Sequence, residues 1–438
     1  MHKKVYLKVF GCQMNAYDSE IVEAMLGKAG YMPAGTPDEA DIILFNTCSV
    51  RAHAEERAFG NVMALRPLKE KHPEKIIGII GCMAQNYGEA LLEKAPFVDL
   101  ICGPDRMWDI PAFVEEIRGG RGPVIACELD GRAGKSVTGQ KKRLKAYVAI
   151  MRGCDNFCTY CVVPYVRGRE RSREVTDIVN EVAQLLDNGV KEITLLGQNV
   201  NSYGKNLADG ITIARLLERL DSLPYKKRIR FLTSHPKDIS PDLISAMRDL
   251  ESVCEHLHLP IQSGSDRILE TMGRGYAVGH FLDIARSFKE NIPAGSLTTD
   301  VIVGFPGESE EDFQATVNVM KKIQFDDSFI FKYSPREKTK AAALTDDVPK
   351  KVKEERNQIL LSLQKEITAA NNQCLIGTTL EVLVETPAKK SRGEVMGRSR
   401  AHKKVVFAAN GNCIGEYIPV EITGQGDFTL TGRAHRAF

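Results

Sequence analysis

The chain has 438 residues and a net charge of +2, and its 43% hydrophobic and 26% charged residues are ordinary for a globular protein of two or three domains. No apolar run reaches the roughly 18 residues that a membrane-spanning helix needs. The first residues lack the apolar region and cleavage site of a signal peptide, so we expect a cytoplasmic protein without a membrane partner. Because cytosolic thiols are kept reduced, the eleven cysteines indicate metal binding or redox chemistry rather than disulfides.

The first part of the chain, residues 1–128, alternates short buried strands with helices, which is typical of an open parallel α/β sheet domain. The strands, rich in Val and Ile, are predicted at residues 4–11, 40–47 and 75–81. Helical patterns cover residues 18–30 and 87–96, and Asp18 or Ser19 is the expected N-cap of the first helix.

A basic segment separates this domain from the next. Residues 129–145 are rich in Gly, Ser and Lys, which predicts a flexible linker. Residues 146–370 then alternate strand and helix, and six such units favour a partial (βα)6 barrel over a full barrel of eight. The six strands are predicted at residues 145–151, 192–197, 228–234, 256–261, 298–305 and 327–334.

The last segment, residues 374–438, changes to short alternating strands with glycine turns, which predicts a small all-β barrel of the OB type. This segment has nine basic and six acidic residues, whereas residues 129–152 have seven and one. A solvated charged surface explains either segment alone. Two basic segments that flank a central domain favour a polyanionic partner such as RNA.

Three cysteines of the central domain, Cys154, Cys158 and Cys161, lie at spacings of four and three residues within the sequence RGCDNFCTYC. Three thiolates on one loop can bind one face of a 4Fe–4S cluster and leave the fourth iron without a protein ligand. The pattern resembles the radical S-adenosylmethionine (SAM) superfamily, in which that iron binds SAM and one electron cleaves it to a 5′-deoxyadenosyl radical. The alternatives are three unconnected core cysteines or a zinc site, which would need a fourth ligand that this loop lacks.

Three cysteines of the first domain, Cys12, Cys48 and Cys82, each follow a predicted strand. The carboxyl ends of parallel strands meet at one edge of a sheet, where ligands bind, so these thiolates could hold a second 4Fe–4S cluster. Cys102 also follows an apolar run and fits the same argument. Buried cysteines often only pack, and the residues alone leave these alternatives open.

Ten short motifs, spread over nearly the whole chain and in the same order, resemble the methylthiotransferase family of radical SAM enzymes. They are GCQMN (11–15), NTCSVR (46–51), GCMAQ (81–85), RGCDNFCTYCVVPYVRGRERSR (152–173), LLGQNVNSYG (195–204), TSHP (233–236), HLPIQSGSD (258–266), RGY (274–276), DVIVGFPGE (300–308) and YSPR (333–336). The family implies an N-terminal cluster domain, a radical SAM core and a C-terminal TRAM domain, which is an OB-like RNA-binding module.

The resemblance implies that Cys12, Cys48 and Cys82 bind an auxiliary 4Fe–4S cluster, and it excludes Cys102. GCQMN and GQNVNSYG are most similar to the branch that adds a methylthio group to C2 of N6-isopentenyladenosine, next to the anticodon of tRNA. The alternative branches modify threonylcarbamoyladenosine in tRNA or an aspartate of a ribosomal protein. Two further alternatives are a radical SAM enzyme with no cluster in its N-terminal domain and a non-catalytic iron–sulfur RNA-binding protein.

The implied partners are the tRNA anticodon loop, an electron donor such as a flavodoxin or ferredoxin, and a sulfur donor that the sequence does not identify. One SAM is expected to methylate sulfur held on the auxiliary cluster, and a second SAM to supply the radical that activates adenine C2. Both clusters must therefore face one cavity. We expect a monomer, with no catalytic residue beyond the six cysteine ligands.

Contacts to SAM and to RNA are predicted from position in the chain. Barrel active sites gather at the carboxyl ends of strands, so polar residues and glycines there are expected to bind SAM, unless they cap helices or close turns. These candidates are Tyr160, Gln198, Asn199, Ser234, Gln262, Ser265, Asp300 and Gly304. Basic residues of the last domain suit phosphate contacts, which position RNA without reading its sequence. These candidates are Lys389, Lys390, Arg392, Arg398, Arg400, Lys403 and Lys404.

Overall fold

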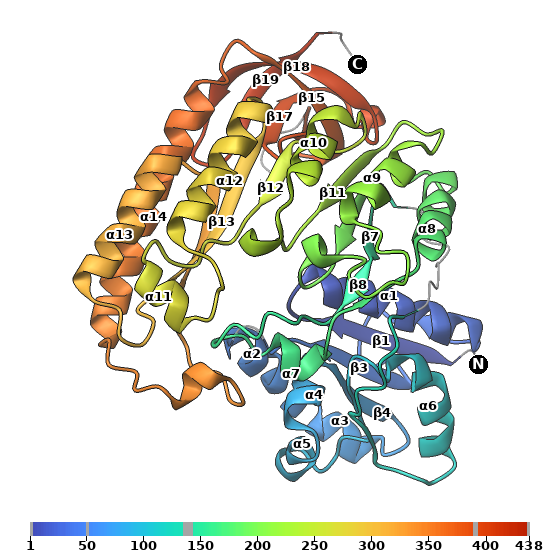
Figure 1. Cartoon of the computed structure of the whole chain (residues 1–438). Helices are drawn as coiled ribbons and strands as arrows, with labels where there is room; N and C mark the ends of the chain where they lie inside the picture. Colours follow the sequence, from blue (N-terminus) through green and yellow to red (C-terminus); the bar gives the residue numbers. More distant parts are fainter. Residues whose placement is uncertain (1–2, 50–51, 135–142, 389–392, 436–438) are drawn as a thin grey trace.

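The chain folds into an N-terminal parallel sheet, a partial βα barrel and a closed five-stranded barrel, in the order that the sequence predicts (Figure 1). The computed structural model describes residues 3–49, 52–134, 143–388 and 393–435. Within these residues, no helix is both long enough and apolar enough to cross a membrane.

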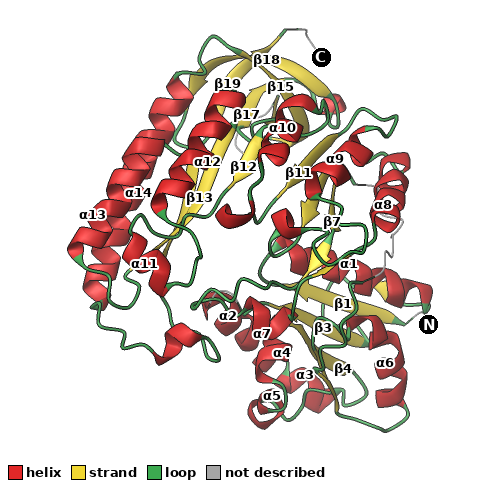
Figure 2. Ribbon diagram, in the orientation of Figure 1, coloured by secondary structure: helices red, strands yellow, loops and turns green. Residues whose placement is uncertain are grey.

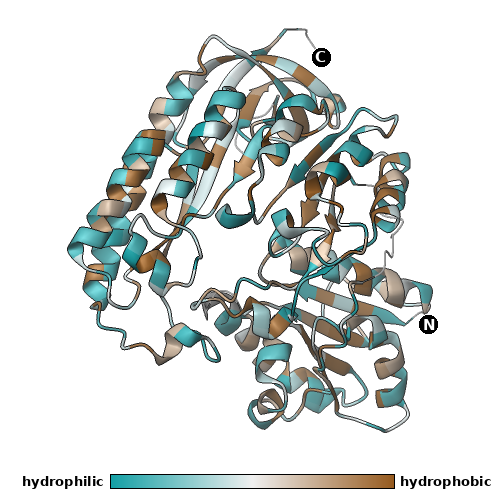
Figure 3. Ribbon diagram, viewed as in Figure 1, coloured by the Kyte–Doolittle hydropathy of each residue, from teal (hydrophilic) through white to brown (hydrophobic). Residues whose placement is uncertain are grey.

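The N-terminal sheet has six parallel strands in the order β2-β1-β3-β4-β5-β6. Their bounds are β1 (Lys4–Val9), β2 (Met32–Pro33), β3 (Ile42–Thr47), β4 (Ile76–Gly81), β5 (Leu100–Cys102) and β6 (Val124–Ala126). The central strands β3 and β4 are buried on both faces, which explains their continuous apolar sequences (Figure 3).

Helices cover both faces of this sheet (Figure 2). One face packs against α1 (Gln13–Lys28) and α6 (Ile110–Arg118). The other packs against α2 (Ala52–Met63), α4 (Cys82–Tyr87) and α5 (Ala90–Lys94), and α3 (Arg66–Lys71) follows α2. Strands β1, β3 and β4 confirm the three strands that the sequence predicts for this domain.

The predicted start of the first helix is wrong. Helix α1 begins at Gln13 with Cys12 as its N-cap, so Asp18 and Ser19 lie inside the helix rather than before it. Both side chains are buried, and the Asp18 carboxylate is paired with arginines of the central domain. The acidic residue that suggests a cap is thus part of a contact between domains.

The central domain contains all six predicted strands, arranged as two three-stranded parallel sheets. The first sheet has the order β11-β10-β7 and the second β12-β13-β14, and a bridge between Ile229 and Val253 connects them. Their bounds are β7 (Lys145–Ala149), β10 (Glu192–Leu196), β11 (Arg228–Phe231), β12 (His256–His258), β13 (Ser296–Val303) and β14 (Asp327–Lys332).

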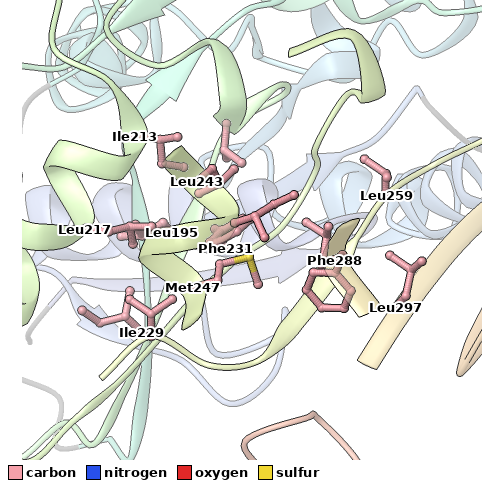
Figure 4. Close-up of a cluster of buried hydrophobic side chains, with 14 of the residues drawn as sticks. Leu195, Ile213, Leu217, Ile229, Phe231, Leu243, Met247, Leu259, Phe288 and Leu297 are labelled. Carbon is pink, nitrogen blue, oxygen red and sulfur yellow. The ribbon is translucent and has the colours of Figure 1, made fainter. Parts of the chain in front are cut away.

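The outer face of this partial barrel is covered by helices, and the main hydrophobic core lies between the two layers (Figure 4). Strand residues such as Phe231 and Leu297 pack there against helix residues such as Leu243 and Phe288. Burying one such side chain contributes roughly 1.5–3 kcal/mol. The helices are α8 (Val175–Asp187), α9 (Ile213–Asp221), α10 (Pro241–Asp249), α11 (Asp266–Thr271), α12 (Val278–Asn291), α13 (Glu310–Ile323) and α14 (Lys350–Gln373).

The N-terminal domain covers the inner face of the first sheet. Helix α1 of the N-terminal domain packs on the inner face of the first sheet, where Met14, Tyr17 and Ile21 contact Ala149 and Leu196. The N-terminal domain therefore fills part of the barrel interior, on the side of β7.

The C-terminal barrel is closed, with strand order β15-β16-β17-β19-β18. Its strands are β15 (Thr379–Pro387), β16 (Glu394–Ser399), β17 (Lys404–Ala408), β18 (Tyr417–Gln425) and β19 (Leu430–Ala434). Two buried arginines at the start of β11 reach it: Arg228 donates to the Arg398 carbonyl oxygen at 2.7 Å, and Arg230 donates to that of Ser399 at 2.7 Å. Ser296, at the start of β13, donates to the Ala401 carbonyl oxygen at 2.7 Å. The C-terminal barrel thus closes the amino end of the partial barrel.

Candidate metal-cluster and cofactor site

The central cysteine loop lies at the opposite, carboxyl end of the partial barrel, between β8 (Met151–Arg152) and α7 (Val163–Arg167). Cys154 and Cys158 are buried and Cys161 is half-buried. An arginine of the barrel wall contacts the loop, because Arg274 Nη1 donates to Cys158 Sγ at 3.4 Å. Burial raises the pKa of Cys154 and of Cys161 to about 12. Thiolates at these positions therefore need a strong positive charge beside them, which a metal centre supplies.

The geometry of the loop fits an iron–sulfur cluster better than a single ion. Among the residues that the structure describes, no three His, Cys, Asp or Glu side chains converge as one metal ion requires. The thiolates of a 4Fe–4S cluster bind separate irons at different corners, so they surround the cluster instead of meeting at a point. Three cysteines on one loop offer ligands for three of the four irons, whereas a structural zinc site would need four convergent ligands.

The N-terminal cysteines follow three adjacent parallel strands. Cys12 follows β1, Cys48 follows β3 and Cys82 follows β4, and the register places Val9 beside Asn46 and Thr47 beside Gly81. The three strands therefore end side by side at one edge of the sheet, as the sequence predicts.

The segments that carry these three cysteines lie close together. A β-carbon on Gly11 would lie 2.3 Å from Cys48 Cβ, so only glycine, with its φ of +107°, allows the chain to reach Cys12 at this point. Burial raises the pKa of Cys82, Arg167 lowers it, and a negative charge on Cys12 raises it again. Cys102, the alternative candidate for a ligand of this cluster, lies instead in the apolar cluster under α1 and α6. The structure thus groups Cys102 with packing residues.

The two cysteine groups face each other across the domain boundary. Cys82 packs against Val162 and Val166 of the segment that follows Cys161. A cavity of about 370 Å³ is lined by Ser49, Met83 and Val162, which directly follow Cys48, Cys82 and Cys161. The edge of the N-terminal sheet therefore lies against the segment that follows the cysteine loop, and the expectation that both clusters face one cavity stays a prediction.

A buried ion-pair network holds this boundary together. Asp18 Oδ1 accepts from Arg152 Nη2 at 2.6 Å, and its Oδ2 accepts from Arg167 Nη2 at 3.0 Å. All three side chains are at most 4% exposed. Arg171 pairs with Asp105, and Arg173 with Glu181. Sequence reasoning missed these roles, although an acidic residue on the apolar side of α1 and four alternate arginines after the cysteine loop were signals for them.

Most of the predicted SAM contacts have partners within the chain. Gln198 Oε1 accepts from the Gly153 peptide N–H at 2.6 Å and so braces the cysteine loop. Ser265 is the N-cap of α11 and donates to Asp312 at 2.5 Å. Gly304 packs against α14, where a β-carbon would lie 2.3 Å from Lys353 Cγ. Asp300 lies 3.5 Å from His258.

The remaining candidates offer polar groups in the cysteine loop and at the carboxyl ends of barrel strands. Ser234 Oγ and Asn199 Oδ1 are buried and, within the described part of the chain, have no hydrogen-bond partner. The Tyr160 hydroxyl accepts from Arg274 Nη1 at 3.4 Å. Gln262 adopts a φ of +70° while its backbone bonds to Asp300 of β13.

The predicted RNA contacts divide into three groups. Lys389, Lys390 and Arg392 lie outside the described residues. Arg398, Arg400 and Lys403 form ion pairs within the chain, with Glu385, Glu255 and Asp326 respectively. Lys404 is exposed. The structure thus gives three of the candidates a structural role, and two of these, Arg400 and Lys403, attach the C-terminal barrel to the central domain.

Three known families match the chain in the order of its three domains. Residues 4–103 match the uncharacterized protein family UPF0004, residues 148–320 the radical SAM superfamily and residues 373–434 the TRAM domain.

Similar proteins cover the whole chain. The "tRNA-2-methylthio-N(6)-dimethylallyladenosine synthase" of Moorella thermoacetica is 44% identical over 427 residues, which cover 97% of this chain and 96% of that protein. The protein of the same name from Acetivibrio thermocellus is 46% identical over 435 residues and covers 98% of this chain and 91% of its own.

The fold resembles solved radical SAM structures. The methyltransferase TsrM from Kitasatospora setae, with cobalamin and a [4Fe-4S] cluster bound, aligns with a TM-score of 0.58 at 14% identity over 78% of this chain and 77% of its own. The cobalamin-dependent SAM radical enzyme OxsB aligns with a TM-score of 0.56 at 11% identity over 84% and 56%. At such low identity, the likeness concerns the fold alone.

Proposed function

The chain belongs to the tRNA-2-methylthio-N(6)-dimethylallyladenosine synthase family of radical SAM methylthiotransferases, and we propose that it adds a methylthio group to C2 of N6-isopentenyladenosine next to the anticodon of tRNA. The observation that carries this proposal is the position of two groups of three cysteines on facing edges of two domains, in contact through Cys82 and Val162. Adenine C2 bears no acidic proton, so a radical route suits the reaction better than acid–base chemistry.

The proposed ligands are Cys154, Cys158 and Cys161 for the radical SAM cluster, and a second set for an auxiliary 4Fe–4S cluster. The second set is Cys12, Cys48 and Cys82. When bound, the first cluster with SAM supplies the radical that takes hydrogen from adenine C2, and the auxiliary cluster supplies the sulfur. The surrounding residues hold the ligands in place: Arg274 donates to Cys158 Sγ, and Gln198 fixes the peptide of Gly153. Val162 and Val166 form an apolar wall that keeps water from the reacting centre.

SAM is proposed to bind where buried polar atoms lie at the carboxyl ends of the barrel strands, the end that also carries the cysteine loop. Ser234 Oγ and Asn199 Oδ1 can bond to its ribose hydroxyls or methionyl ammonium, since buried polar groups require partners. Tyr160 and Gln262 are further proposed contacts. A flavodoxin or ferredoxin is the proposed electron donor, and we propose a cytoplasmic monomer.

For tRNA, we propose that the TRAM domain contacts phosphates through Lys404, Lys389, Lys390 and Arg392. The substitution Lys404→Glu should weaken tRNA binding and lower the slope of log affinity against log salt by more than about 1, since one phosphate contact becomes a repulsion. Filter binding at several salt concentrations measures both quantities. The comparison variant is Lys403→Glu, whose side chain pairs with Asp326 and is only 14% exposed. It should lower thermal stability instead, and equal salt slopes for the two variants would contradict the assignment.

Mass analysis of tRNA nucleosides tests the function itself. Cells that lack this protein should lose 2-methylthio-N6-isopentenyladenosine and accumulate the isopentenyl precursor. Loss of the methylthiolated threonylcarbamoyl nucleoside instead would assign the chain to another substrate. Unchanged nucleosides, together with no formation of 5′-deoxyadenosine from SAM by the reconstituted protein, would indicate a non-catalytic iron–sulfur protein.

A further inference from the structure

The inner face of the second barrel sheet carries an aromatic and polar surface. Phe329 of β14 lies beside Asp300 of β13 in the parallel register. The neighbouring residues of these strands, such as Val301 and Ile330, point to the opposite face and pack in the outer core. His258 of β12 lies on the inner face as well, since its ring meets that of Phe329 edge-on with centroids 6.1 Å apart.

Phe329 is held rigidly while much of its ring remains accessible. It is 51% exposed, although it lies on a strand in the barrel interior and not in a surface loop. His258 is fixed beside it, with Nδ1 at 3.0 Å from Thr298 Oγ1 and Nε2 at 3.5 Å from the Asp300 carboxylate. An aromatic face with polar groups at its edge is the arrangement with which proteins bind unstacked nucleobases.

This inner surface connects the two ends of the proposed site. At its carboxyl end, Arg274 donates to the Pro260 carbonyl oxygen at 2.8 Å and also to Cys158 Sγ. At its amino end, burial raises the pKa of Asp327 and the charges of Lys403 and Lys404 oppose that shift, which places both lysines near the start of β14. An RNA held at Lys404 therefore lies next to the surface that leads to the cysteine loop.

We propose that Phe329 is the stacking platform for a base of the tRNA anticodon loop that is splayed into the barrel, with His258 and Asp300 bonding to its edge. The inference rests on the proposed function and names the residue that receives the base. SAM also contains a purine, but its site is at the carboxyl ends of the strands. Phe329 is the third residue of a six-residue strand and lies toward the TRAM end.

Binding of an anticodon stem-loop that contains N6-isopentenyladenosine tests this proposal. The substitution Phe329→Ala should weaken binding roughly 5- to 150-fold, as the loss of one base–aromatic stack does, and Phe329→Trp should restore it. With a stem-loop that is abasic at the target nucleotide, wild type and Phe329→Ala should bind equally. The control is Ile359→Ala, because Ile359 is 50% exposed but lies on helix α14, and this substitution should not change the affinity.

Three results would overturn the proposal. The first is equal affinity of Phe329→Ala and Ile359→Ala for the intact stem-loop. The second is a loss that persists with the abasic stem-loop, because the ring would then act on something other than the base. The third is weaker SAM binding with unchanged RNA binding, which would place the SAM adenine on the ring. If wild-type protein neither binds nor modifies the tRNA, the proposed function itself fails, and thermal melting of each variant confirms that it is folded.

Discussion

Replacing Cys82 with alanine should abolish methylthiolation while SAM cleavage continues. Cys82 belongs to the proposed auxiliary ligands, and the proposed SAM-cleaving ligands lie on a separate loop, from Cys154 to Cys161. Without the auxiliary cluster there is no sulfur for the substrate radical. Iron should fall from about eight to about four atoms per chain, the content of one 4Fe–4S cluster. Chromatography of 5′-deoxyadenosine and of the nucleoside products measures the two activities separately.

Two further variants make this experiment specific. Cys154→Ala should lose both activities, because it removes a ligand of the SAM-cleaving cluster. Cys102→Ala should lose neither, since Cys102 is as buried as Cys82 and ends the next strand of the sheet but packs in an apolar cluster. Retention of about eight irons by the Cys82→Ala protein would refute the ligand assignment. So would a loss of iron in Cys102→Ala.

Replacing Asp18 with asparagine should cost about 3–5 kcal/mol of the free energy of unfolding, because it leaves Arg152 and Arg167 buried without their counter-charge. Urea denaturation measures this loss by circular dichroism. Fluorescence offers a second reading, since Trp108 is the one tryptophan of the chain and the Arg152 guanidinium lies 5.7 Å from its ring centroid. The unfolding transition monitored by Trp108 fluorescence should therefore shift to a lower urea concentration, because this tryptophan lies beside the weakened contact between the domains.

The control for this variant is an exposed ion pair of the same domain. Arg66 and Glu70 pair one helical turn apart with both side chains 65% exposed, so Glu70→Gln should cost less than about 1 kcal/mol. If Asp18→Asn were no more destabilising than Glu70→Gln, the network around Asp18 would have no special importance for the domain boundary.

The sequence carries enough information for the order of strands and for the convergence of the cysteines. Apolar segments rich in isoleucine identify β3 and β4, because strands buried on both faces have little place for polar residues. Since these strands are parallel, the cysteines after them must share an edge. Both conclusions follow from local patterns together with one topological rule.

Contacts between distant parts of the chain are not encoded in such patterns. Aspartate is a residue type that favours helix N-caps, so the sequence suggests a cap at Asp18. Only its partner Arg152, 134 residues later, reveals that Asp18 forms an ion pair between domains. The charges of Arg400 and Lys403 suggest phosphate contacts, but Glu255 and Asp326 neutralise them in the fold. Charge identifies what a residue can bind, and the tertiary structure decides which partner it meets.

The attachment of the C-terminal barrel to the amino ends of the strands has a geometric consequence. Backbone carbonyl oxygens of that barrel accept hydrogen bonds from Arg228, Arg230 and Ser296, and these bonds fix its orientation relative to the partial barrel. The eight residues of β13 then separate it from the cysteine end by a fixed length of about 26 Å. Under the proposed function, an RNA bound at the C-terminal barrel reaches the cysteine end only with a nucleotide about this distance from the bound phosphates. The distance would then help to select the position that is modified.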